Sequence, residues 1–102
     1  MRPMDPSSGA ARVVLYGAPG CHLCDEARDV LERVLADRRA DGRAAAILVE
    51  VDIHGDEAFV RAYMESIPVV EIGGRRLELA TSPARVRAFV ASELDGVVAE
   101  PS

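Results

Sequence analysis

The sequence contains no lysine, asparagine, glutamine or tryptophan. Its positive charge therefore comes from 12 arginines scattered along the chain, and 17 acidic residues bring the net charge to -5. A nucleic-acid-binding surface needs a basic patch that faces the phosphates, and an acidic chain without a basic block does not provide one. The missing residue types, together with abundant alanine and arginine, are typical of a GC-rich coding genome and indicate a bacterial origin.

Long apolar runs are also missing. No segment approaches the roughly 20 apolar residues that a membrane-spanning helix requires. The opening stretch MRPMDPSSGAA has an early arginine but lacks the apolar region of a secretory signal. We therefore expect a cytoplasmic protein without membrane contact. Residues 1–11 are predicted to be a flexible leader, residues 12–95 one domain with a single core, and residues 96–102 a loose tail.

Apolar patterns predict the elements of the first half of the domain. Apolar, β-branched runs favour buried strands at 12–16 and 47–51, and apolar residues at helical spacing predict a helix over 22–37 between them. A strand, a helix and a strand of these lengths predict a parallel strand pair. A short second helix is expected over residues 56–65, with Asp56 as its N-cap.

The second half of the domain is predicted to contain a hairpin and a last helix. VVEI at 69–72 and RRLEL at 75–79 flank a Gly-Gly pair, which is typical of a type I′ turn between antiparallel strands. The last helix begins with Ser82 as N-cap and Pro83 at its first position, and it continues up to Gly96. The order β-α-β-α-β-β-α predicts an α/β fold in which helices flank a mixed four-stranded sheet.

The motif CHLC at residues 21–24 carries the chemistry of the sequence. A thiolate is the nucleophile that attacks a disulfide, and a helix N-terminus, where Cys21 stands, stabilises a thiolate. Cys24 lies one turn further along the same helix face, close enough to resolve a mixed disulfide held on Cys21. Between them, a protonated His22 would favour the thiolate, whereas Asp25 and Glu26 would oppose it.

Other interpretations of the two cysteines compete with a redox couple. A zinc site needs four ligands, or three and a water, and only His22 and His54 offer further soft donors. Two chains could instead share an iron-sulfur cluster as a non-enzymatic carrier, or the fold could be a peptide-binding module with incidental cysteines. Cytosolic thiols are kept reduced, and a strand, a loop and CxxC at a helix start favour redox use over two small side chains that merely pack.

Three stretches carry a resemblance to a known family: YGAPGCHLCDEA at 16–27, VEVDI at 49–53 and SIPVVEIGGR at 66–75. On these motifs and the element order, which together span residues 12–94, the chain resembles the glutaredoxin-like proteins of the thioredoxin superfamily. The similarity is greatest to the short bacterial branch whose active site reads PGCHLCDEA. The resemblance implies a thioredoxin/glutaredoxin-like fold and a thiol-disulfide oxidoreductase that uses Cys21 and Cys24.

The resemblance also implies a substrate-binding surface. In that family the proline matching Pro68 is cis and faces the active-site cysteines, and the backbone of the preceding residue, Ile67, pairs with the bound substrate like an added strand. His22 and Leu23 stand where typical dithiol glutaredoxins carry Pro-Tyr. Residues 80–82 replace the motif that receives the glutamyl end of glutathione, although a helix N-terminus remains there for an anion. The expected substrate-contacting residues are His22, Leu23, Ile67, Pro68, Thr81 and Ser82.

These departures bear on the partner. Tyr16 and Gly17 stand where a glutathione-binding lysine usually lies, so glutathione, mycothiol and a protein disulfide all remain open. We expect no metal and no bound cofactor, with a thiol such as glutathione or mycothiol as co-substrate. The expected partners of a monomer are protein disulfides or low-molecular-weight thiols, and a thiol reductase. Arg75 and Arg76, beside the hairpin turn, are expected to be solvated.

Overall fold

The computed structural model describes residues 11–43 and 46–96. In chain order its elements are β1 (Ala11–Gly17), α1 (His22–Ala40), β2 (Ala46–Asp52), the 3-10 helix η1 (Ile53–Gly55), α2 (Glu57–Tyr63), β3 (Val69–Ile72), β4 (Arg75–Leu77) and α3 (Pro83–Asp95). The predicted order is confirmed, with one short 3-10 helix added. Of the predicted leader (residues 1–11) and tail (residues 96–102), only Ala11, which begins β1, and Gly96, which caps α3, are described; the remainder lies outside the described residues. None of the described helices has the length and apolar character needed to span a bilayer.

The four strands form one mixed sheet in the order β2-β1-β3-β4. β1 pairs with β2 in parallel, as the strand-helix-strand unit predicted. On its other side, β1 pairs with β3 in antiparallel. β3 and β4 form the predicted antiparallel hairpin, and Gly73 and Gly74 at its turn have φ angles of 59° and 90°. A type I′ turn needs a positive φ at both central residues, which glycine adopts without steric cost.

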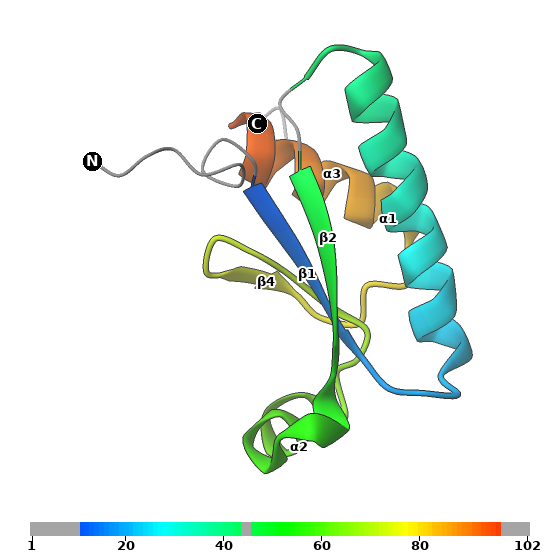
Figure 1. Cartoon of the computed structure of the whole chain (residues 1–102), viewed down its shortest axis with the longest axis vertical. Helices are drawn as coiled ribbons and strands as arrows, with labels where there is room; N and C mark the ends of the chain where they lie inside the picture. Colours follow the sequence, from blue (N-terminus) through cyan, green and yellow to red (C-terminus); the bar gives the residue numbers. More distant parts are fainter. Residues whose placement is uncertain (1–10, 44–45, 97–102) are drawn as a thin grey trace.

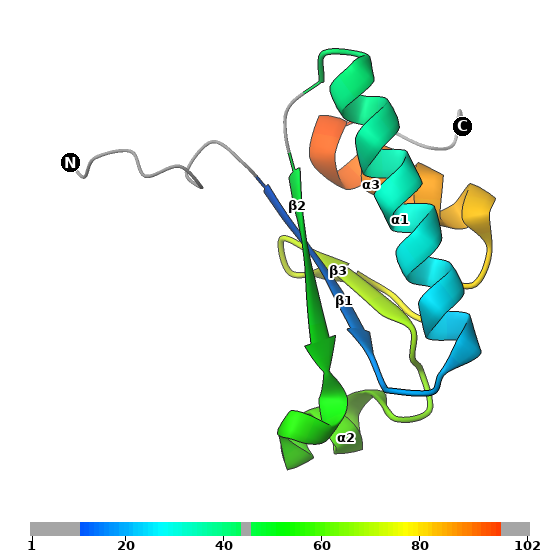
Figure 2. The same cartoon turned by 45° about the vertical axis from the view of Figure 1, so that its right-hand side comes forward.

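Helices cover the sheet unequally. α1 and α3 lie together on one face, whereas α2 lies at the end of the sheet where β1 and β2 finish (Figures 1 and 2). The main core lies between the sheet and the two long helices. Its fully buried members include Val13 of β1, Leu31 of α1, Val70 of β3 and Val90 of α3. This packing fixes the start of α1 relative to the end of β1.

A second, smaller core forms where α2 meets the other face of the sheet. Tyr16 of β1 contacts Phe59 edge-on at a centroid distance of 5.4 Å and lies against Tyr63 at 4.6 Å. Both separations are in the range in which aromatic pairs attract one another. Val69 and Ile53 are buried in the same cluster. α2 is thereby held against the strand that leads to the cysteines.

The caps that the sequence predicted are present. The Asp56 carboxylate accepts the N–H of Ala58 at 2.8 Å, and the Ser82 hydroxyl accepts the N–H of Arg85 at 3.2 Å. Gly96 ends α3 with a φ of 70°, the left-handed conformation that glycine adopts readily at a helix end.

Three predicted boundaries are wrong. α1 continues to Ala40 instead of ending at residue 37, because Arg38 is buried and bonds to Asp95 at 2.6 Å, which holds this turn in the helix. α2 ends at Tyr63, where the Tyr63 carbonyl accepts the N–H groups of both Ser66 and Ile67. β4 ends at Leu77, two residues early, because Leu79 turns away with a φ of 50° and donates its N–H to Ser66.

Candidate active site

Cys21 occupies the N-cap of α1. Its backbone is extended, with φ -90° and ψ 109°, and its Sγ accepts a hydrogen bond from the N–H of Cys24 at 3.1 Å. The loop from β1 is closed by the N–H of Cys21, which donates to Ala18 at 3.3 Å, and the helix starts with the N–H of Asp25 donating to the Cys21 carbonyl at 3.0 Å. The Cys21 sulfur therefore receives an N–H of the first helical turn, at the helix end where negative charge is favoured.

Cys24 lies in a different environment although it is only one turn away. It is buried, whereas Cys21 is half-buried, and both thiols are free. The pKa of Cys24 is raised to about 11, chiefly because burial disfavours the thiolate. A hydrogen bond between its thiol and Cys21 raises the pKa further, and so does the negative charge of Asp25. A half-buried cysteine thus stands at the helix start, one turn before a buried cysteine whose raised pKa favours the thiol form.

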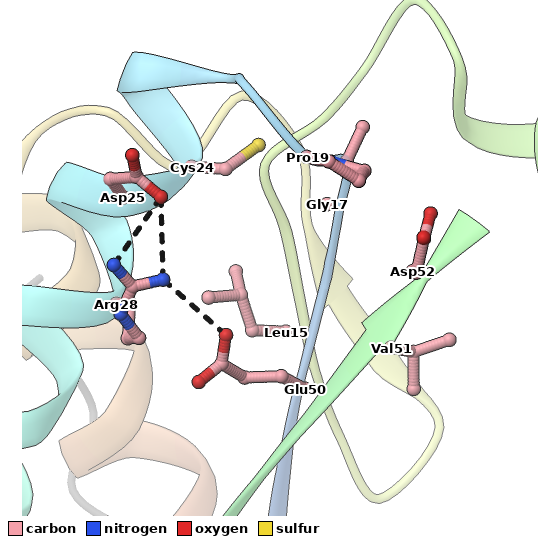
Figure 3. Close-up of a pocket in the computed structure, with 10 residues that line it drawn as sticks. Leu15, Gly17, Pro19, Cys24, Asp25, Arg28, Glu50, Val51 and Asp52 are labelled. Atoms are coloured by element: carbon pink, nitrogen blue, oxygen red, sulfur yellow. Dashed lines mark hydrogen bonds and ion pairs between the residues drawn. The ribbon is translucent and has the colours of Figure 1, made fainter. Parts of the chain in front are cut away.

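A pocket of about 270 Å³ borders Cys24 on the side of β2 (Figure 3). Arg28 crosses it, pairing with Asp25 at 3.3 Å and with Glu50 of β2 at 3.5 Å. Sequence reasoning missed Arg28 and Glu50, because 22 residues separate them and only the pairing of β1 with β2 brings Glu50 to this position.

Pro68 and Ile67 lie at the same end of the sheet. Val69, the next residue, pairs with Tyr16 of β1, so Pro68 is next to the point where the chain leaves β1 for the cysteines. Pro68 is fully buried, and its peptide bond with Ile67 is cis. The Ile67 N–H donates to the Tyr63 carbonyl at 3.0 Å, and the Pro68 carbonyl accepts the N–H of Ala80 at 2.8 Å. The segment before β3 is therefore tied to both α2 and the loop before α3.

Of the remaining predicted substrate contacts, His22 and Leu23 stand between the cysteines in the chain, and Thr81 and Ser82 precede α3. His22 and Leu23 are exposed, and Leu23 leaves 47% of its surface accessible. Thr81 lines a small cavity of about 150 Å³ together with Glu26 of α1, so the loop before α3 reaches the first turns of α1. The Ser82 hydroxyl is engaged as the N-cap of α3.

Arg75 and Arg76 are exposed, as expected of charges beside a turn, and each also has a partner in another element. Arg76 donates to the Tyr63 hydroxyl at 2.9 Å and lies 5.8 Å from the centre of that ring, while Arg75 pairs with Glu93 of α3 at 3.3 Å. Arg76 thus links β4 to α2. The sequence around Arg76 does not indicate this partner, because the Tyr63 hydroxyl lies 13 residues away in the chain.

In the part of the chain that the structure describes, no three His, Cys, Asp or Glu residues form a group that could hold a metal ion. Within residues 11–43 and 46–96, no third side chain of these types joins Cys21 and Cys24 to form such a group.

Comparison with known proteins agrees with this architecture. Residues 12–94 match the family described as glutaredoxin-like domain (DUF836). The solution NMR structure of protein Ne2328 from Nitrosomonas europaea is similar in fold, with a TM-score of 0.52 and 21% sequence identity over 91% of this chain and 95% of that chain. No curated protein matches the sequence. With the family matched over nearly the whole described domain, the chain belongs to the glutaredoxin-like domain family.

Proposed function

We propose that this protein is a thiol-disulfide oxidoreductase in which Cys21 is the nucleophile and Cys24 is the resolving cysteine. The observation that carries the proposal is the asymmetry of the two sulfurs. Cys21 is accessible and accepts an N–H at the start of α1, while Cys24 is buried with a raised pKa of about 11. Of two such sulfurs, the one accessible at a helix N-terminus is suited to attack from solvent. Membership of the glutaredoxin-like family supports the same function.

The reaction consists of two exchanges. The Cys21 thiolate attacks one sulfur of a substrate disulfide, forms a mixed disulfide and expels the other substrate sulfur as a thiolate. Cys24 then loses its proton to solvent and attacks Cys21 Sγ, which expels the second substrate thiolate and leaves a Cys21–Cys24 disulfide. The substrate gains two electrons, and the protein loses them. Two molecules of a thiol such as glutathione or mycothiol, which become oxidised to their disulfide, or one thiol reductase, supply the two electrons that restore the dithiol.

The surface around Cys21 provides the substrate contacts of this proposal. His22 and Leu23 project beside the nucleophile, and the segment Ile67–Pro68 lies where the chain leaves β1 for the cysteines. A protein disulfide or a low-molecular-weight disulfide would lie against these groups. Thr81 and Ser82, at the start of α3, are the proposed contacts for the remainder of the substrate.

Thiol trapping tests the proposal. Purified protein is equilibrated in a series of dithiol redox buffers, quenched with an alkylating agent and weighed by mass spectrometry. The expected result is one two-electron transition to an intramolecular Cys21–Cys24 disulfide, which disappears in Cys21→Ser and in Cys24→Ser. With a model disulfide, Cys24→Ser should accumulate a mixed disulfide on Cys21, whereas Cys21→Ser should form far less.

The absence of this disulfide across the buffer series would overturn the proposal. In that case, anaerobic reconstitution with iron and sulfide would test the carrier that the sequence left open, through visible absorbance that requires Cys21. Partner capture that is unchanged in Cys21→Ser and Cys24→Ser would instead indicate a peptide-binding module.

A further inference from the structure

Gly17 lies against the buried cysteine. If position 17 carried a Cβ, that atom would lie 3.0 Å from Cys24 Sγ and 3.1 Å from Cys24 Cβ, which is tighter than most unbonded contacts of a Cβ, so the neighbour would have to move by a few tenths of an ångström. Apart from Gly17 itself and its two neighbours in the chain, no other described residue has an atom within 4 Å of that Cβ. In Figure 3 the Cys24 sulfur points toward this end of β1. The missing side chain of Gly17 therefore provides the space that Cys24 occupies.

We infer that Gly17 is a positioning residue for Cys24, and that its lack of a side chain sets the place from which the Cys24 sulfur attacks Cys21. This inference rests on the proposed oxidoreductase function. Among the atoms that a Cβ at position 17 would meet within 4 Å, both belong to Cys24 and none to Cys21, so we place the effect of Gly17 on Cys24.

The requirement is steric and does not come from backbone conformation. Gly17 ends β1 in register with Asp52 of β2, and it is not among the glycines with positive φ. Alanine can adopt this backbone without strain. Gly20, in the following loop, differs in this respect because its φ is 79°.

Rotation of the Cys24 side chain cannot relieve the contact. A change of χ1 moves Sγ but leaves Cβ in place, and Cβ alone is 3.1 Å from the added atom. The helix turn must therefore move away from β1, or the sulfur and its Cβ must shift together. Disulfide formation depends on sulfur positions within narrow limits of distance and dihedral angle, so a shift of a few tenths of an ångström changes the second exchange.

The surroundings favour a shifted sulfur over an unfolded protein. Cys24 borders the pocket of about 270 Å³, so its side chain has space on one side. The end of β1 is held by its pairing with β2. The first turn of α1 is held by the hydrogen bond that the Cys24 N–H donates to Cys21 Sγ. We therefore expect the added methyl group to displace Cys24 relative to Cys21 while the remainder of the sheet persists.

Gly17→Ala tests the inference, with Gly55→Ala as the matched control. Gly55 also lacks a positive φ, and a Cβ there would meet nothing within 4 Å. The probe is 5,5′-dithiobis(2-nitrobenzoate), followed by stopped-flow absorbance. The first coloured thiolate reports attack by Cys21, and the second reports resolution by Cys24. Each glycine variant is also combined with Cys24→Ser, which isolates the first exchange.

In Gly17→Ala we expect the second release to slow at least tenfold, while the first release in the Cys24→Ser background stays within twofold of its parent. Gly55→Ala should change neither rate. A second release in Gly17→Ala as fast as in the unmodified protein would overturn the inference. An unmodified protein that gives no second release would instead overturn the proposed function, so the two failures are distinguishable.

Thermal unfolding by circular dichroism accompanies the rates. If Gly17→Ala lowers the melting temperature too far for kinetics, Gly17→Ala/Cys24→Ala removes the sulfur that meets the new methyl group. Gly17→Ala should lower the melting temperature less in the Cys24→Ala background than in the unmodified protein, because the sulfur contact is gone while the Cβ contact remains. Equal losses in the two backgrounds would contradict the sulfur contact.

Discussion

The N–H of Ile67 donates a hydrogen bond to the Tyr63 carbonyl at 3.0 Å, and the same carbonyl accepts the N–H of Ser66 at 2.7 Å. Within residues 11–43 and 46–96, no main-chain N–H donates to the Ile67 carbonyl. The family resemblance pairs the Ile67 backbone with an added substrate strand. Because the Ile67 N–H is engaged at the end of α2, a substrate that adds such a strand in the proposed reaction must donate to the Ile67 carbonyl.

This asymmetry predicts the effect of N-methylation on peptide substrates. A series of disulfide-linked peptides is methylated at one amide at a time, at the substrate cysteine and at each neighbour. One position should raise KM about two- to tenfold, the cost of one hydrogen bond, with kcat unchanged because the contact is present in both bound states. Equal KM values across the whole series would contradict a donor requirement at Ile67.

The raised pKa of Cys24 predicts how the second exchange depends on pH. Burial, the largest cause, persists when Cys21 is held in a mixed disulfide, so the pKa of Cys24 should stay well above neutral. Below a pKa of about 11, the thiolate fraction rises about tenfold for each pH unit, and the rate of resolution should rise with it between pH 6 and 9. Stopped-flow measurement of the second thiolate release checks this slope.

A charge variant provides the control for that experiment. Asp25 is the smallest named cause that raises the pKa of Cys24, so Asp25→Asn should speed resolution by about twofold at fixed pH. Asp29→Asn, one turn further along α1, should leave the rate unchanged. A second exchange that does not vary with pH between 6 and 9 would show that loss of the Cys24 proton does not limit it.

Tyr16 should contribute to stability through its hydroxyl and its ring separately. Its hydroxyl donates to Glu71 at 2.7 Å, so Tyr16→Phe should lower the free energy of unfolding by about 1 kcal/mol. Tyr16→Leu also removes the ring contacts with Phe59 and Tyr63 and should lose about 0.5–1.5 kcal/mol more. Urea unfolding with circular dichroism measures both.

The loss in Tyr16→Phe should not change with pH. Burial first, and the bond to Glu71 second, raise the pKa of Tyr16 to about 12, so the hydroxyl remains a donor from pH 6 to pH 9. Unequal losses at those two pH values would show that the hydroxyl ionises or that Glu71 takes another partner.

Local patterns in the sequence predicted most of the fold. The hairpin and the caps at Asp56 and Ser82 each depend on residues close together in the chain, so periodicity and capping chemistry are sufficient to locate them. The position of Cys21 at the start of α1 followed in the same way from a strand and an amphipathic helix. The parallel pair joins residues as distant as Ala11 and Ala46, and it followed instead from the strand-helix-strand order.

The features that sequence reasoning missed depend on distant partners. α1 passes its predicted end because Arg38 meets Asp95, 57 residues later. The polar hydroxyl of Tyr16 reaches Glu71, 55 residues away. The sequence gives no sign that Gly17 makes room for Cys24. Only the packing of α1 on β1 shows that a side chain at position 17 would meet Cys24. No local pattern carries these contacts, because the packing of helices and strands against one another creates them.

The ion pair between Arg38 and Asp95 predicts how stability changes in acid. Arg38 is buried and bonds to the Asp95 carboxylate at 2.6 Å, and Arg43 adds a second bond at 3.0 Å. The bond from Arg38, followed by the charges of both arginines, lowers the pKa of Asp95. Because the folded-state pKa lies below the unfolded value of about 3.9, this stabilisation is present above that value and is lost as pH falls through the folded pKa.

Asp95→Asn should therefore flatten the acid limb of the stability curve. The difference in free energy of unfolding between the unmodified protein and Asp95→Asn should be largest above pH 5 and should shrink as the pH falls toward 2. Asp37→Asn is the matched control, since its pair with Arg87, at 3.5 Å, joins side chains that are 59% and 50% exposed and should contribute little. Urea unfolding at pH 6, 4 and 2.5 measures all three proteins. Parallel curves for the unmodified protein and Asp95→Asn would show that the Asp95 charge does not stabilise the junction of α1 and α3.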